Sequence, residues 1–128
     1  MNANTAMAVI AFIGISACQH RTTQTADFIP GTYVNHAESA YSISDDTLEV
    51  TVDETTENTY RLLRRSTFRR IAEDGSKGEP VHQREQWTAV FNPETGTLTE
   101  TRKRRNITVQ PESGTLTVEK RVYNKLTD

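Results

Sequence analysis

The sequence is poor in the residues on which most enzymes and metal proteins depend, with one cysteine and three histidines in 128 residues. A single cysteine cannot form an intramolecular disulfide, which excludes a disulfide-stabilised scaffold. The histidines lack metal-ligand spacing, and the chain has neither a Gly-rich phosphate loop nor a Gly-x-Ser-x-Gly segment. We therefore expect no enzyme activity, no metal and no cofactor.

Apolar residues are also scarce once the N-terminus is set aside. They make up 34% of the chain, but twelve of them lie in the first 17 residues, and only about 29% of the remainder is apolar. A chain of this length forms at most one domain with a modest core. Threonine occurs 20 times and favours strands, which indicates a small β-rich domain rather than disorder.

The only long uncharged run extends from Ala6 to Ala17. Twelve helical residues span ~18 Å, which is too short for the ~30 Å hydrocarbon core of a bilayer. The length fits the apolar region of a signal peptide. A buried helix and an uncleaved anchor are the alternatives, although a packed helix would show polar residues along one face.

The run ends in Ile15-Ser16-Ala17-Cys18, which resembles the lipobox of bacterial lipoproteins. The resemblance implies cleavage behind Ala17 and lipidation of Cys18, which would anchor the protein in a membrane. Gln19 stands where an aspartate would imply retention at the inner membrane, so we expect the outer membrane, facing the periplasm. The sequence thus divides into a signal peptide at 1–17, a lipidated cysteine with a polar tether at 18–27, and a folded domain at 28–128.

The folded domain consists of short alternating segments separated by turn residues, which is the pattern of antiparallel β-structure. Segments 91–99 and 109–117 repeat each other: an apolar residue, a Pro-Glu turn with a following glycine, and then Thr-Leu-Thr. In both, proline fixes φ at the turn, and Gly96 or Gly114 supplies the left-handed position that leads into the next strand. A weaker third copy at 44–50 predicts another turn at Asp45-Asp46.

We predict an all-β fold, an antiparallel meander of about eight strands that forms a small barrel or a strongly curved sheet. Closure would remove the exposed strand edges that promote aggregation. Leu63 and Phe68 break the alternation of the longest strand, which indicates a β-bulge or a bend. The predicted strands are Gly31–Asn35, Tyr41–Ile43, Thr47–Asp53, Thr59–Ile71, Val81–Phe91, Thr97–Lys103, Asn106–Val109 and Thr115–Lys125.

The start of the domain, Ile29-Pro30-Gly31-Thr32-Tyr33, is similar to the Gly-x-Trp opening strand of small lipocalin-like barrels on bacterial lipoproteins, with Tyr33 in place of tryptophan. The resemblance implies a barrel and an apolar-ligand cavity, and it implies no catalytic residues. Leu62, Trp87 and Phe91 are the candidates to line such a cavity. Trp87 lies at an inward strand position, where a core role is the simpler interpretation.

Charge is segregated along the chain although its net value is only −2. Residues 1–57 carry a net charge of −7 and residues 58–128 a net charge of +5. Two interpretations of the basic residues remain open: cross-strand pairing with glutamates, or a surface for an anionic lipid or an envelope protein. The chain has no nucleic-acid-reading motif, so we expect no nucleic-acid partner. The candidates for the basic surface are Arg65, Arg69, Arg104 and Arg105.

Together these features predict a lipid-anchored lipoprotein of the bacterial envelope that acts as a non-catalytic binding or accessory module in envelope, secretion or conjugation machinery. Its partners would be the membrane, through Cys18, and an envelope protein or anionic lipid, through the basic surface. A carrier of a small apolar ligand and an inhibitor or immunity-type lipoprotein are the alternatives. An inhibitor would use the hairpin tip at Glu73–Gly78.

Overall fold

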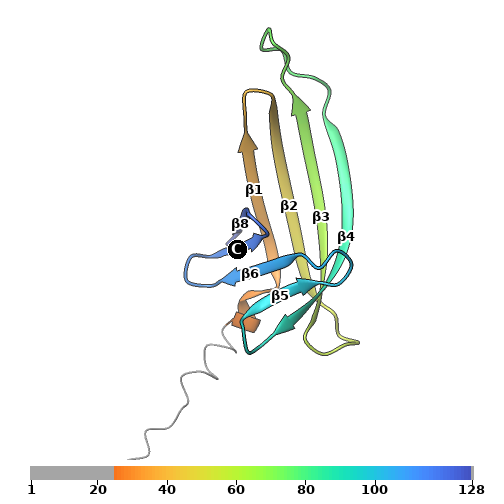
Figure 1. Ribbon diagram of the computed structural model, residues 1–128, viewed down its shortest axis with the longest axis vertical. Coiled ribbons are helices and arrows are strands. Elements are labelled where there is room, and N and C mark those ends of the chain that lie inside the picture. The colour runs from red at the N-terminus through yellow and green to blue at the C-terminus, as the bar shows by residue number, and fades with distance from the viewer. Residues whose placement is uncertain (1–24, 128) are drawn as a thin grey trace, which may run out of the picture.

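Eight antiparallel strands, each paired with the next in chain order, close into a barrel in the computed structural model, which describes residues 25–127 (Figure 1). The last strand pairs with the first through Tyr33↔Lys125 and Val34↔Asn124. The predicted all-β meander and its barrel form are therefore confirmed. The strands are β1 (Gly31–Glu38), β2 (Ser42–Val52), β3 (Thr59–Arg70), β4 (Val81–Asn92), β5 (Thr97–Glu100), β6 (Asn106–Gln110), β7 (Thr115–Val118) and β8 (Arg121–Lys125).

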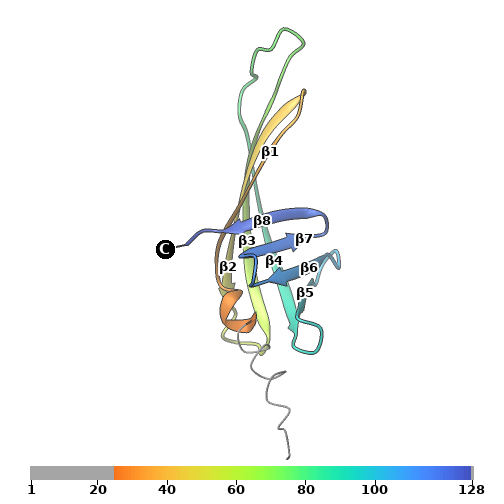
Figure 2. The same cartoon turned by 90° about the vertical axis from the view of Figure 1, so that its left-hand side faces the viewer.

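The strands differ in length, and this difference shapes the molecule. β2, β3 and β4 contain 11, 12 and 12 residues, whereas each of β5 to β8 contains only 4 or 5. The short strands cross the lower part of the long ones, and the long strands continue past them as a curved sheet (Figures 1 and 2). We call the closed part the barrel body and the extension, at 35–46 and 66–83, the arm.

Alternation along the strands fills the barrel body with apolar side chains. Successive residues of a strand point to opposite faces, and Trp87, Ala89 and Phe91 on β4 are all buried. Tyr33 and Tyr123 are the largest of the fully buried side chains. The interior is thus occupied by one packed cluster. Its members are Ile29, Tyr33, Leu48, Val50, Tyr60, Leu62, Trp87, Ala89, Phe91, Leu98, Ile107, Val109, Leu116, Val118 and Tyr123.

The predicted turn at Asp45-Asp46 is wrong. β2 is continuous through this segment, and Asp46 lies opposite Asn35 on β1 and Ser66 on β3. Because adjacent acidic residues are common in turns, the local pattern favoured a break. A buried aspartate inside a strand needs partners from other parts of the chain, and a local pattern does not reveal them.

The predicted single strand at 115–125 is also wrong, because it is two strands, β7 and β8. They are joined by a turn that includes Glu119, whose φ is 56°. The turn changes the phase of the alternation, so that Tyr123 is buried. Val122, which a single uninterrupted strand would place on the same face as the buried Leu116 and Val118, is 45% exposed. The predicted number of strands is still right, because the two errors cancel: the predicted break at Asp45-Asp46 does not exist, and the break between β7 and β8 was not predicted.

The predicted bulge in the longest strand is absent. β3 keeps an unbroken register with both neighbours over all the residues that pair. The apolar pattern breaks because the strand leaves the barrel body: beyond Leu62, the inward positions are Arg64, Ser66 and Phe68. These positions belong to the open end of the barrel and to the arm, where no apolar core is required.

Residues 25–28 are helical, and Ala26 and Phe28 pack against the core, so the folded part begins slightly before the predicted start at 28. The Phe28 ring meets Tyr33 edge to face, with 6.0 Å between centroids, and the Lys125 ammonium lies 4.3 Å from the Phe28 centroid. Cys18 and the predicted signal peptide lie outside the described residues. Within residues 25–127, no helix has the length and apolar character needed to cross a membrane.

The two copies of the repeated hairpin adopt the same turn, as their sequences predict. Gly96 and Gly114 have φ values of 70° and 69°, in the left-handed region that glycine reaches without steric cost. A Cβ atom added at either position would meet nothing within 4 Å. The penalty for a larger side chain is therefore backbone strain alone, and it should be equal at the two sites.

We expect Gly96→Val and Gly114→Val to lower the free energy of unfolding by similar amounts, each more than ~1 kcal/mol, because β-branched residues disfavour positive φ. Asparagine at the same positions should cost less, since it tolerates the left-handed region. Urea denaturation followed by tryptophan fluorescence measures both effects. Clearly unequal losses for the two valine variants would show that the turns are not equivalent.

Candidate functional site

The open end of the barrel body, where the arm begins, is built around one buried carboxylate. Asp46 on β2 is 3% exposed. Its Oδ2 accepts hydrogen bonds from Arg64 at 3.0 Å and from the Tyr123 hydroxyl at 3.1 Å, and it is also ion-paired with Arg121. One side chain therefore joins β2, β3 and β8. Its negative charge, which would be costly to bury alone, is compensated by two guanidinium groups.

The polar contacts continue from Arg64 to β4. Arg64 also donates to Glu85 at 3.2 Å, and the other oxygen of Glu85 accepts the indole N–H of Trp87 at 2.9 Å. This indole hydrogen bond is the largest influence on Glu85, and together with the neighbouring cations it lowers the pKa of that carboxyl below its ordinary value despite partial burial. The Arg105 guanidinium lies 4.2 Å from the Trp87 ring centroid and 3.6 Å from Glu85. The loop that carries Arg105 is thereby tied to the long strands.

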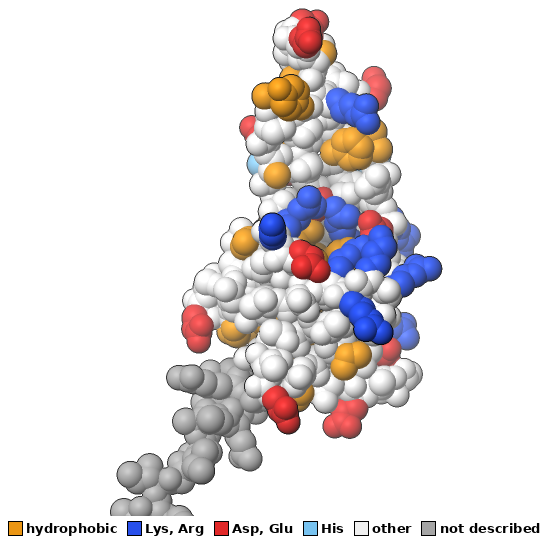
Figure 3. Space-filling model, viewed as in Figure 1, with side chains coloured by type: hydrophobic (Ala, Val, Ile, Leu, Met, Phe, Trp, Pro, Cys, Tyr) orange, Lys and Arg blue, Asp and Glu red, His pale blue; other side chains and the backbone are white. Residues whose placement is uncertain are grey.

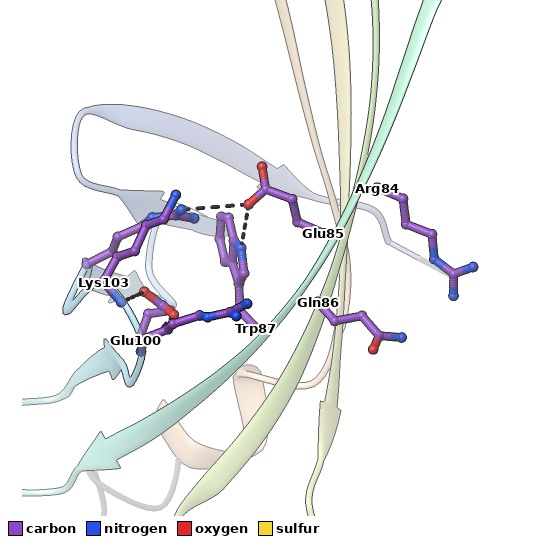
Figure 4. Close-up of a pocket in the computed structure, with 8 residues that line it drawn as sticks. Arg84, Glu85, Gln86, Trp87, Glu100 and Lys103 are labelled. Atoms are coloured by element: carbon purple, nitrogen blue, oxygen red, sulfur yellow. Dashed lines mark hydrogen bonds and ion pairs between the residues drawn. The ribbon is translucent and has the colours of Figure 1, made fainter.

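A second buried carboxylate holds the loop between β5 and β6. Glu100 is 1% exposed, and its two oxygens accept the backbone N–H groups of Arg102 and Lys103 at 2.9 and 2.8 Å. Burial would raise the pKa of Glu100, but these N–H groups keep it below its ordinary value. β5 therefore ends at Glu100 instead of the predicted Lys103. Glu85, Trp87, Glu100 and Lys103 lie on the same side of β4 (Figure 4).

A hollow of about 700 Å³ lies beside these side chains. Arg64, Trp87 and Arg105 line it, together with the β7–β8 turn and the start of β8. Figure 3 shows Lys and Arg side chains gathered around a depression at the level where the short strands cross the long ones. We call this hollow, together with the cations of the β5–β6 loop at 102–105, the basic mouth.

Several cations of the basic mouth have no carboxylate within ion-pair distance in the described part of the chain. The acidic side chains nearby are already engaged: Asp46 and Glu85 by arginines, Glu100 by backbone N–H groups, and Glu119, which also lines the hollow, by the backbone N–H of Asn106 at 3.2 Å. The region therefore carries uncompensated positive charge. The cations without such a partner are Arg102, Lys103, Arg104 and Lys120.

The four basic residues singled out from the sequence lie in two separate places. Arg65 and Arg69 are on the outer face of β3, where Arg65 is ion-paired with Glu49. Arg104 and Arg105 are on the β5–β6 loop, with Arg105 turned inward over the indole of Trp87. Only the second pair contributes to the basic mouth.

The three residues predicted to line an apolar cavity are all buried. Leu62 and Phe91 are 1% and 3% exposed and belong to the packed core. Trp87 also belongs to the core, but it lies at its upper boundary and lines the hollow as well. Of the three, Trp87 alone is placed to meet a ligand of the basic mouth.

Sequence reasoning missed the residues at the centre of this site, above all Asp46, Arg64 and Arg121. A signal existed for Asp46, because it is two residues before Leu48 and four before Val50 and so shares their inward phase. An acidic residue in phase with buried aliphatic residues predicts a compensated carboxylate. The partners of that carboxylate come from other strands and cannot be read locally.

His36 and His82, the two histidines in the described part of the chain, do not form a shared site. The outer face carries His36, Asp45, Thr67 and His82 in one cross-strand row, so that two strands separate the two histidines. His36 contacts Asp45 at 2.5 Å and Glu38 at 2.8 Å, and the hydrogen bond to Asp45 raises the pKa of His36 most strongly. Among residues 25–127, no group of three or more potential ligands could hold a metal ion.

Comparison of the chain with protein-family models, curated proteins and solved structures gives no significant match. Function must therefore be argued from the geometry and charge of the site, since a barrel fold by itself specifies no activity.

We expect Asp46→Asn to lower the free energy of unfolding by roughly 3 kcal/mol, because it leaves Arg64 and Arg121 without their counter-charge. Asp45→Asn is the matched control: the neighbouring residue is exposed on the outer face, and its loss should cost less than ~1 kcal/mol. Urea denaturation at neutral pH compares the two variants. Equal losses would contradict a central role for the Asp46 carboxylate.

Proposed function

We propose that this protein is a lipid-anchored, non-catalytic binding module of a bacterial envelope, and that it binds an acidic partner protein at the basic mouth. The observation that carries the proposal is the group of cations without carboxylate partners. Lys120 lines the hollow, and the other three lie on the β5–β6 loop, whose Arg105 lines the same hollow. The lipid anchor rests on the resemblance of residues 15–18 to a lipobox.

The fixed backbone of the basic mouth supports a binding role. Glu100 fixes the β5–β6 loop, and Arg105 is stacked on Trp87, so the loop needs little ordering when a partner binds. Cations on fixed backbone attract an acidic surface and accelerate its association, an effect that salt weakens. A partner rich in aspartate and glutamate would satisfy the charges that the chain itself leaves unpaired.

The carrier alternative finds less support. A carrier of an apolar ligand needs an empty apolar interior, whereas Tyr33, Leu62 and Tyr123 belong to a packed cluster inside the barrel body. The hollow at the open end is lined by as many charged as apolar side chains, so it does not offer a purely apolar ligand a matching surface. The packed interior is the stronger argument against a carrier.

The inhibitor alternative has one observation in its favour. The hairpin tip at Glu73–Gly78 joins β3 to β4 and projects beyond the rest of the arm (Figure 1). A tip of this kind could enter the active site of an envelope enzyme. If the inhibitor alternative holds, replacing the tip with a two-residue turn should abolish inhibition of that enzyme. The same change should leave binding at the basic mouth unchanged.

The anchor predicts the fate of one variant. Cys18→Ser should leave an unprocessed precursor that accumulates without acyl chains, whereas the wild-type protein should be recovered from membranes as a lipidated chain that begins at Cys18. Acyl chains contribute ~0.8 kcal/mol for each buried CH₂, so the wild type should resist extraction by salt. Mass spectrometry of the intact protein measures both the start of the mature chain and its acylation. A mature chain that starts elsewhere and carries no acyl groups would contradict the predicted lipid anchor.

Charge reversal tests the basic mouth. The triple variant Lys103→Glu, Arg104→Glu and Lys120→Glu should weaken binding to polyglutamate of about 20 residues at least ten-fold at low salt. The control variant with the same change of net charge carries glutamate at exposed positions of the arm and its tip, and it should weaken binding less than three-fold. These control positions are Arg69, Arg70 and Lys77.

Circular dichroism establishes that both triple variants are folded. Equal losses in the two variants would mean that only net charge matters, which contradicts a localised site. If anionic lipid vesicles bind through the basic mouth and polyglutamate does not, the partner is a lipid surface and not an acidic protein.

A further inference from the structure

Over positions 81–88, β4 has a neighbouring strand on one side only. It pairs with β3 over Val81 to Val90, but with β5 only over Ala89 to Asn92. Among residues 25–127, no strand pairs with the other side of β4 at positions 81–88. The closure that removes exposed edges from the barrel body therefore stops short of this segment.

The direction of the backbone groups on this edge follows from two hydrogen bonds. The N–H of Phe91 donates to Asn58 on the side of β3, whereas the carbonyl of Thr88 accepts from Thr101 on the opposite side. These directions alternate along an antiparallel strand, so the N–H and C=O groups of the even-numbered residues of β4 point away from β3. The residues whose N–H and C=O groups point to the open edge are His82, Arg84 and Gln86.

A cleft of about 740 Å³ follows the same edge. Arg84 and Gln86 line it from the outer face of β4, and Glu85 and Trp87 line it from the inner face (Figure 4). Side chains from both faces of one strand can line a single cleft only where it passes along the edge of that strand. The β5–β6 loop forms the opposite wall.

The charge of the cleft selects its occupant. Its basic residues are Arg84 and three cations of the β5–β6 loop, whereas its two acidic residues, Glu85 and Glu100, are already engaged. An extended segment that lies along β4 would place one row of side chains toward Arg84 and the other toward Lys103. Acidic side chains fit both rows.

We propose that the edge of β4 from His82 to Gln86 is the docking site for an extended acidic segment of a partner protein, which joins the sheet as an additional strand. Main-chain hydrogen bonds to the edge provide affinity, and the cations on either side provide selectivity. The inference rests on the proposed binding function and adds to it the conformation of the partner and the backbone groups that bind it.

A second copy of this chain is a poorer occupant. Two β4 edges could pair antiparallel through the backbone groups of His82, Arg84 and Gln86. In that pairing, Arg84 lies opposite Arg84 of the other copy. Like charges directly opposite each other destabilise a sheet. The same cation favours an acidic strand.

The test uses a capped twelve-residue peptide of alternating threonine and glutamate, titrated into the folded domain and followed by NMR. The amides of His82, Arg84 and Gln86 should shift and become protected from hydrogen exchange when the peptide binds. Gln86→Pro removes an N–H that points away from β3, so the β3–β4 pairing remains intact. This variant should bind the peptide at least ten-fold more weakly, and Gln86→Ala, which keeps the N–H, should bind within three-fold of the wild type.

A fully N-methylated form of the same peptide provides a test that needs no protein variant. It has the same charge but cannot donate main-chain hydrogen bonds, and its binding should be at least ten-fold weaker. If this peptide and the Gln86→Pro variant bind normally while Lys103→Glu still weakens binding, the edge inference is overturned and the proposed function stands.

Two other outcomes also overturn the inference. If the unmodified peptide does not bind and charge reversal at the basic mouth leaves polyglutamate binding unchanged, the proposed function fails as well. If sedimentation shows a dimer that Gln86→Pro dissociates, and the peptide does not bind, the occupant of the edge is a second copy of the chain.

Discussion

The buried carboxylate of Asp46 is the interaction on which the rest of the structure depends. It marks the level on β2 at which the interior changes from polar to apolar. The next inward side chains toward the barrel body, Leu48 and Val50, are buried and apolar. β8 is paired with β1 through only two residues, so the bonds of Arg121 and Tyr123 to Asp46 add a second attachment of the C-terminal hairpin to the long strands. A hydrophobic residue in place of Asp46 would leave this attachment unmade.

The difference in strand length connects the fold with the proposed binding role. Long strands beside short ones produce an open end, and the open end leaves strand edges without partners. On the edge of β1, the Asn35 side chain donates to the carbonyl of Val122 at 2.8 Å and so takes up one position next to β8. The edge of β4 is instead flanked by cations, which deters a second copy of the chain and favours an acidic strand.

Much of the fold could be predicted from the sequence because it is encoded locally. Alternation gave the all-β class, and the Pro-Glu turns that end at Gly96 and Gly114 gave two hairpins with matching geometry. The candidate site was harder, because its central residues are defined by contacts between distant strands. Asp46 was assigned to a turn, and the inward position of Arg105 depends on Trp87, which lies on a different strand. Lipidation of Cys18 stays a prediction.

The pairing that closes the barrel has a kinetic consequence. All the other pairings join strands that follow each other in the chain, so each of them closes only a short loop. The closing pairing instead joins Tyr33 and Lys125, which come from opposite ends of the folded domain. Closing a long loop costs more conformational entropy, and contacts between distant residues slow folding. We expect an open eight-stranded sheet to precede the finished barrel, with its apolar inner face exposed until β8 pairs with β1. The last few residues of the chain thus determine how long the protein stays vulnerable to proteases and aggregation.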